Sequence, residues 1–230
     1  MMRQLSALLL LGGALYAQPA VFDSLKAPSD APLTADPKSR FWRDVKGIQF
    51  ETDFYGKPVP NHRTEVRSRW TPTHLYLLYT CDYDELTLKS SPSTTAETNQ
   101  LWNWDVAEAF LGSDFNDITR YKEFQVSPQG EWVDLDIDKS GKKRGGGVDW
   151  NSGFEVKARV DQAAKKWYGE MKIPFKALGV DAAAGREIRA GMFRCAGAGE
   201  HRKYVSWQPT GSRSFHVPEK FGILRLTSSK

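Results

Sequence analysis

The strongest constraint on the fold is the spacing of the apolar residues, which recur at every second position in short runs divided by turns. In the run Thr64–Trp70, Val66, Ser68 and Trp70 share one side and charged residues take the other, as on a half-buried strand. Comparable runs follow at 75–80, 106–111, 122–127, 132–137, 154–160, 167–173, 188–195, 205–207 and 222–227. The clearest helical pattern is brief, at 174–179. Short strands with hardly any helix predict an all-β fold, an antiparallel β-sandwich.

The first 17 residues are expected to be a signal peptide. They carry one early cation, Arg3, then an apolar run and small residues up to Ala17, where we predict cleavage. That run is too short to span a bilayer, and no later segment is apolar enough to do so. We therefore expect a secreted or periplasmic protein without a membrane span, with an N-terminal lead-in at 18–40 and a single domain at 41–228.

Charge and cysteine content restrict the partners and the redox state. The chain has 32 Lys and Arg against 28 Asp and Glu, and this small, scattered excess argues against a nucleic-acid partner. The two cysteines, Cys81 and Cys195, each end an apolar run in a chain expected to be exported. They predict a disulfide, with two separately buried thiols as the alternative.

The stretch LWNWDVAEAFL at 101–111 contains the most unusual pattern. If 106–111 is a strand, Val106, Glu108 and Phe110 share one face. A carboxylate between two apolar neighbours needs a partner or a wet cavity, because burying it unpaired costs several kcal/mol. Trp102 lies just before the strand, where a loop can present it at a rim, although core packing is the more ordinary role of a tryptophan.

Several segments together resemble family 9 carbohydrate-binding modules, which are DOMON-like β-sandwiches known from bacterial xylanases. The family's order is followed by the segments LYLLYTCDYD, LWNWDVAEAFL, KEFQVSPQGEW, KWYGEMKIPFKALG and SWQPTGSRSFHVPEKFGILRL. The resemblance covers 41–226, nearly the whole predicted mature chain. The W-x-x-D-x-x-E pattern and the P-x-x-F-G ending are the most specific. The resemblance implies a non-catalytic protein that binds an oligo- or polysaccharide and supports polysaccharide breakdown or uptake.

In that family two aromatic side chains clasp a terminal sugar while polar groups bind its hydroxyls. Trp102 matches the first aromatic and Phe215 the second, where a tryptophan stands in the family, so we expect both rings to wall one slot. Glu108 matches a hydroxyl-binding carboxylate at its floor. Such a set suits a pyranose, which offers C–H groups on one face and hydroxyls at its rim. The resemblance implies six ligand-binding residues: Trp102, Asp105, Glu108, Gln125, Arg194 and Phe215.

Catalysis is the first alternative. Asp105 and Glu108 are three residues apart, so on a strand they point to opposite faces, about 10 Å apart along it. A glycosidase pair must face one bond at about 5–9.5 Å. No nucleophile or zinc-protease motif is present. We identify no catalytic residue, and a hydrolase with another carboxylate pair stays an alternative. So does an adaptor without strong sugar affinity, acting beside separate exported glycoside hydrolases.

Metal and haem binding are the remaining alternatives. Asp134, Asp136 and Asp138 alternate along one predicted strand, but Lys139 stands where an EF-hand loop requires glycine. A solvated strand face and a structural calcium both remain open, with no metal ligands assigned. DOMON-like relatives include haem carriers, which need axial His or Met. The four histidines lie mainly in predicted loops, and we expect no required cofactor.

Overall fold

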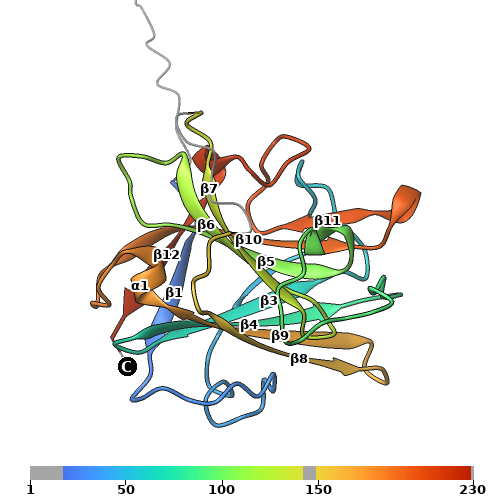
Figure 1. The fold of residues 1–230 in the computed structure, drawn as a ribbon, viewed down its shortest axis with the longest axis horizontal. Helices are drawn as coiled ribbons and strands as arrows, with labels where there is room; N and C mark the ends of the chain where they lie inside the picture. Colours follow the sequence, from blue (N-terminus) through green and yellow to red (C-terminus); the bar gives the residue numbers. More distant parts are fainter. Residues whose placement is uncertain (1–17, 142–148, 229–230) are drawn as a thin grey trace, which may run out of the picture.

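The computed structural model describes residues 18–141 and 149–228, so the predicted signal peptide lies outside the described residues. These residues form an all-β fold with one short helix, as predicted (Figure 1). The strands are β1 (Val21–Lys26), β2 (Ile48–Phe50), β3 (Thr64–Trp70), β4 (His74–Asp82), β5 (Val106–Gly112), β6 (Arg120–Val126), β7 (Trp132–Asp138), β8 (Glu155–Asp161), β9 (Lys166–Pro174), β10 (Glu187–Ala196), β11 (Lys203–Ser206) and β12 (Gly222–Thr227). The helix is α1 (Phe175–Leu178), and the 3₁₀ turns are η1 (Leu101–Asn103), η2 (Gly199–His201) and η3 (Pro218–Lys220).

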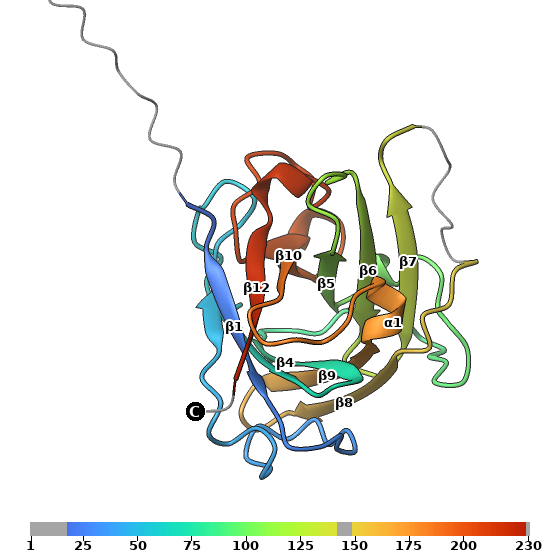
Figure 2. The same cartoon turned by 90° about the vertical axis from the view of Figure 1, so that its left-hand side faces the viewer.

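The strands make one large mixed sheet that curls back on itself. Their order is β7-β6-β5-β10-β12-β1-β3-β4-β9-β8, with β11 paired to β10 and β2 to β3. The half containing β5 and β6 therefore faces the half containing β4 and β9, in a nearly closed, barrel-like shape (Figure 2). Most pairs are antiparallel, but β1 runs parallel to both β12 and β3, which joins the two halves.

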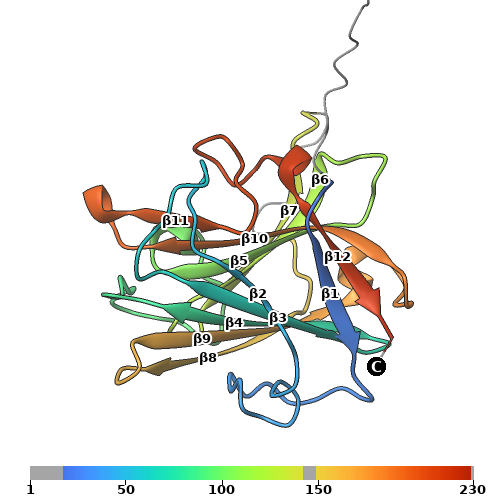
Figure 3. The same ribbon diagram turned by 180° about the vertical axis from the view of Figure 1, so that it is seen from behind.

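Part of the predicted lead-in belongs to this sheet. Within 18–40, β1 lies between β12 and β3 and buries Phe22 in the main core (Figure 3). Further along, the carboxylate of Glu170 on β9 accepts hydrogen bonds from the amides of Thr34 and Ala35 at 2.6 Å each and from the Trp42 indole at 2.7 Å. This region therefore covers the outer side of β4 and β9 and is anchored by a buried charge.

Two apolar clusters lie on opposite faces of β5. Ala107, Ala109 and Leu111 belong to the main core between the sheet halves. Val106 and Phe110 belong to a second cluster on the other face, where Glu108 also points. The alternation predicted for this strand is therefore confirmed, and the second face carries the candidate site.

The predicted disulfide is not formed, because both cysteines are buried free thiols. Cys81 on β4 packs in the main core. Cys195 on β10 packs in the second cluster, on the other face of the sheet. The β10 backbone therefore separates the two thiols, and the alternative of two separately buried cysteines applies.

The aspartates of β7 are each engaged by protein groups. Asp134 accepts a hydrogen bond from the Ser152 amide at 2.9 Å, while Asp136 forms an ion pair with Lys122 at 2.6 Å. Asp138 forms an ion pair with Arg120 at 3.2 Å. In the part of the chain that the structure describes, these carboxylates are not gathered into a group that could hold a metal ion. Within 18–141 and 149–228, no helix has the length and apolar character needed to cross a membrane.

Candidate functional site

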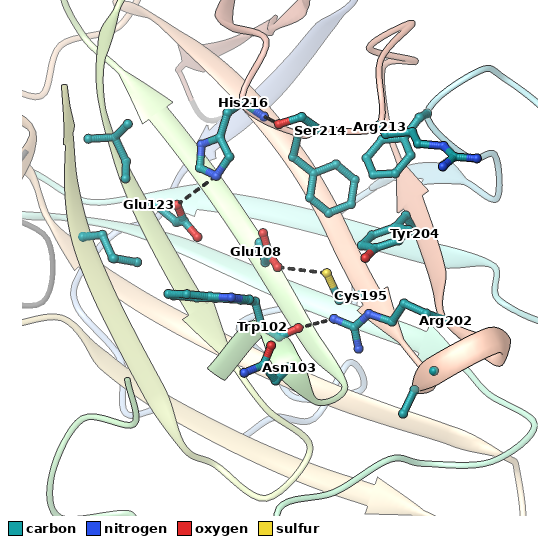
Figure 4. A pocket seen from close by; sticks show the side chains of 16 residues that line it. Trp102, Asn103, Glu108, Glu123, Cys195, Arg202, Tyr204, Arg213, Ser214 and His216 are labelled. Atoms are coloured by element: carbon teal, nitrogen blue, oxygen red, sulfur yellow. Dashed lines mark hydrogen bonds and ion pairs between the residues drawn. The ribbon is translucent and has the colours of Figure 1, made fainter. Parts of the chain in front are cut away.

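A cavity of about 650 Å³ opens on the face of β5, β6 and β7 that points away from the main core (Figure 4). Glu108 from β5 and Glu123 from β6 form its floor, and Leu135 from β7 continues it. Its walls come from η1, from the chain that runs from the end of β10 through β11 to β12, and from Phe54 between β2 and β3. Segments far apart in the sequence therefore build it, because strand pairing brings their ends together.

Trp102 and Phe215 both line this cavity, as the family resemblance implies. Trp102 is half-buried in η1, whereas Phe215 is only 6% exposed. The Phe215 ring stacks on Phe193 with centroids 4.3 Å apart and planes inclined by 16°, and it also contacts Phe54 at 4.9 Å. Phe215 is thus a fixed wall, and Trp102 offers the more accessible ring.

Arg202 fixes the segment that carries Trp102. Its guanidinium donates hydrogen bonds to the carbonyl oxygen of Trp102, to that of Trp104 at 3.1 Å and to that of Gly197 at 2.7 Å (Figure 4). A planar guanidinium can serve several acceptors in fixed directions. Arg202 therefore ties η1 to the end of β10 and sets where the indole stands.

Asp105 does not line the cavity. Its carboxylate is buried and accepts hydrogen bonds from the amides of Gly197 at 2.8 Å and Thr87 at 3.3 Å. Asp105 of the W-x-x-D-x-x-E pattern therefore has a structural role. Its hydrogen bonds join the chain before β5 to the chain after β10.

Arg194 lies on the wrong face to reach the cavity. It follows Phe193 and precedes Cys195, both of which belong to the second cluster, so strand alternation turns Arg194 into the main core. There it donates to the carbonyl oxygen of Asp82 at 2.6 Å and lies over the Trp167 ring at 5.8 Å. The predicted role of Arg194 as a ligand contact is therefore wrong.

Glu108 and Glu123 are diagonal neighbours on one face. Glu108 pairs with Gln125 across β5 and β6, and Glu123 pairs with Phe110. The Cys195 thiol donates to Glu108 Oε1 at 3.2 Å. Gln125 is buried and donates to Glu123 Oε1 at 2.5 Å, so it supports the second carboxylate and does not line the cavity.

Burial sets the electrostatics of this floor. It raises the pKa of Glu108 above the ordinary glutamate value, and the Cys195 hydrogen bond and the charge of Arg202 offset only part of that effect. Burial, followed by the negative charge of Glu108, raises the pKa of Glu123 still further. The pair therefore holds a proton readily when no ligand compensates it.

His216 closes the cavity beside Glu123. Its Nδ1 lies 2.7 Å from the Tyr121 hydroxyl and its Nε2 lies 4.0 Å from Glu123 Oε2. Burial, followed by the positive charge of Lys139, lowers the pKa of His216 to about 4. The imidazole is therefore neutral at pH 7 and does not compensate the charge of Glu123.

The lining residues that sequence reasoning missed include Glu123, Arg202, Tyr204 and His216. A signal existed for Glu123, because it lies two positions before Gln125 on a predicted strand and so shares its face. Arg202 and His216 lie outside the strands, where no periodicity fixes the direction of a side chain.

Residues 37–229 match the family described as carbohydrate family 9 binding domain-like. The chain belongs to this family. An extracellular protein of Arthroderma benhamiae is 25% identical to it over 177 residues, which make up 72% of this chain and 78% of the relative.

Solved structures show that the fold is shared. A Bacteroides uniformis protein proposed to bind carbohydrate has a TM-score of 0.73 at 16% identity, over 91% of this chain and all of that one. A family 9 carbohydrate-binding module of Caldicellulosiruptor kristjanssonii in complex with cellotriose has a TM-score of 0.65 at 12% identity, over 92% and 95%. The module with glucose gives 0.64 at 12%, over 90% and 97%.

Proposed function

We propose that this family 9-like protein is exported and holds one sugar unit of a plant-type or related polysaccharide against Trp102. The observation that carries the proposal is that Trp102, Phe215 and Glu108 line the same cavity. The cellotriose and glucose complexes of structural relatives support a glycan of the cello-oligosaccharide kind. The extracellular relative supports action outside the cell.

The chemistry of the cavity suits a pyranose. A sugar ring presents C–H groups on its faces, which an indole covers, and hydroxyls at its rim, which carboxylates accept. The cavity volume of about 650 Å³ lies in the ordinary range of small-ligand sites. Open sites with a few aromatic and polar contacts give micromolar to millimolar dissociation constants, about −8 to −4 kcal/mol.

Hydrolysis is a second candidate, because Glu108 and Glu123 place two carboxyls on one cavity floor. A retaining glycosidase needs one ionised nucleophile and one protonated acid on either side of the scissile bond. Here burial raises the pKa of both groups and so works against the ionised nucleophile that this mechanism needs. Binding without turnover therefore fits the floor better, and a reducing-sugar assay on cellotriose checks this.

Calorimetric titration of the mature protein with cellotriose and xylotriose tests the proposal. Trp102→Ala should weaken binding at least about tenfold, because it removes the accessible ring. Phe115→Ala is the matched control, since Phe115 is 47% exposed and lies outside the cavity. Equal affinities for the wild type and Trp102→Ala, with both folded by circular dichroism, would refute the assignment.

A further inference from the structure

The two carboxyl groups on the floor of the cavity have few hydrogen-bond donors from the protein. Glu108 is 2% and Glu123 is 4% exposed, yet both line the cavity. Among the described residues, the weak thiol donor of Cys195 makes the one hydrogen bond to the Glu108 side chain. Glu123 receives one, from Gln125. One oxygen of each carboxylate therefore has no protein donor and is available to a ligand.

Among the described residues, the nearby lysine and arginines donate no hydrogen bond to the Glu108 or Glu123 carboxylate. Arg202 donates to three backbone carbonyls, and the guanidinium of Arg213 points away from Glu108 (Figure 4). Lys139 donates to the carbonyl oxygen of His216 at 2.5 Å. The titratable and charged groups around the pair are Tyr121, Lys139, Cys195, Arg202, Arg213 and His216. None of them forms a hydrogen bond to the free carboxylate oxygens.

Such a pair needs a proton or a ligand that brings positive charge. A buried carboxylate without a partner is strongly disfavoured, and two of them side by side are more so. A divalent metal ion suits the floor poorly, because calcium needs six to eight oxygens and the described residues gather no group of metal-ligating side chains here. An ammonium group suits it well: it donates three hydrogen bonds, and aromatic ring faces attract it.

We propose, building on the carbohydrate-binding function above, that the cavity selects a sugar with a free amine, such as β-1,4-linked glucosamine. Its ammonium would take hydrogen bonds to Glu108 and Glu123 while Trp102 covers the ring. Binding then places the positive charge of the ligand where the empty site holds a proton, so that proton is released to solvent. A neutral sugar would make the same contact with the Trp102 ring but would not release a proton.

The test compares three trimers on one skeleton: fully deacetylated chitotriose, cellotriose and the N-acetylated trimer. We expect the amine trimer to bind about tenfold more tightly than cellotriose at pH 7 and low salt, because charge-assisted hydrogen bonds are stronger. At pH 6, titration in two buffers of different ionisation enthalpy should show proton release for the amine trimer only. Equal or weaker affinity for the amine trimer would overturn the inference.

Glu123→Gln separates charge from shape. It should weaken binding of the amine trimer about tenfold more than binding of cellotriose, because only the amine trimer makes a charge-assisted hydrogen bond to this carboxylate. Glu155→Gln removes the same charge from an exposed position on β8, with 61% side-chain exposure, and should change neither. Equal losses of affinity for both trimers in Glu123→Gln would overturn the inference. It would also be overturned if the wild type bound cellotriose only with calcium and Glu123→Gln lost that binding, because the floor would then hold a metal ion. If no trimer binds the wild type, the proposed function itself fails.

Discussion

Arg202→Ala tests how the binding ring is positioned. The change removes three hydrogen bonds, to the carbonyl oxygens of Trp102, Trp104 and Gly197. It leaves the Trp102 indole and both floor carboxyls in place, and it also removes the positive charge that lowers the pKa of Glu108. We therefore expect weaker sugar binding through a misplaced Trp102, and not through a lost sugar contact.

The magnitude follows from the bond to the Trp102 carbonyl. A hydrogen bond from a charged donor contributes about 1.5–3 kcal/mol, and the lower end applies because this donor is only partly buried. If that free energy holds η1 in its binding-competent position, its loss lowers apparent affinity by about tenfold. Arg202→Lys keeps the charge but not the planar fork, so it should recover only part of the loss.

A double-mutant cycle with Trp102→Ala provides the assay. Isothermal titration with the best-binding trimer gives the affinity of the wild type, both single variants and the double variant. If Arg202 acts through Trp102, its substitution has little further effect once the indole is gone. Additive losses would refute the positioning role and indicate that Arg202 contacts the sugar itself. Thermal melts should show that all four proteins remain folded.

Three further predictions concern the scaffold. Glu170→Ala leaves two backbone amides and a buried indole without an acceptor, so denaturant unfolding should show a loss of at least about 3 kcal/mol; an unchanged midpoint would contradict the anchor. Burial raises the pKa of Glu108 from 4.5 to about 7, so the folded protein binds more protons than the unfolded chain in this range. The melting temperature should therefore fall as the pH rises from about 4.5 to 7, and Glu108→Gln together with Glu123→Gln should flatten that slope. Under non-reducing conditions the denatured protein should titrate as two thiols, Cys81 and Cys195, and the native protein should react slowly because both are buried; a finding of no free thiol would restore the disulfide.

Local patterns predicted the strands well. The alternation in β3 and β5 can be read from the sequence because each side chain of a strand points to the opposite face from its neighbours. It correctly placed Glu108 on a face separate from Ala107 and Ala109. The lead-in was harder to interpret, because β1 spans six residues and its parallel pairing with β12 depends on the far end of the chain.

Strand neighbours were beyond the reach of local patterns. The pairing of β10 with β5 decides that Cys195 meets Glu108 and that Arg194 turns into the main core. Two cysteines at the ends of strands fit a disulfide equally well until the faces of those strands are known. The physical reason is that strand pairing is a long-range choice, and it sets which faces meet.

The sequence by itself therefore determined the fold class and the face on which Glu108 lies, and its resemblance to the family pointed to the two cavity rings. Only the tertiary structure decided that Glu123 lies diagonally beside Glu108, that Arg202 holds the Trp102 turn and that His216 closes the wall. Periodicity fixes the direction of a side chain within a strand, whereas sheet curling and irregular connections fix which distant side chains share one space. The raised pKa values of Glu108 and Glu123 arise because the tertiary structure buries the two carboxyls side by side.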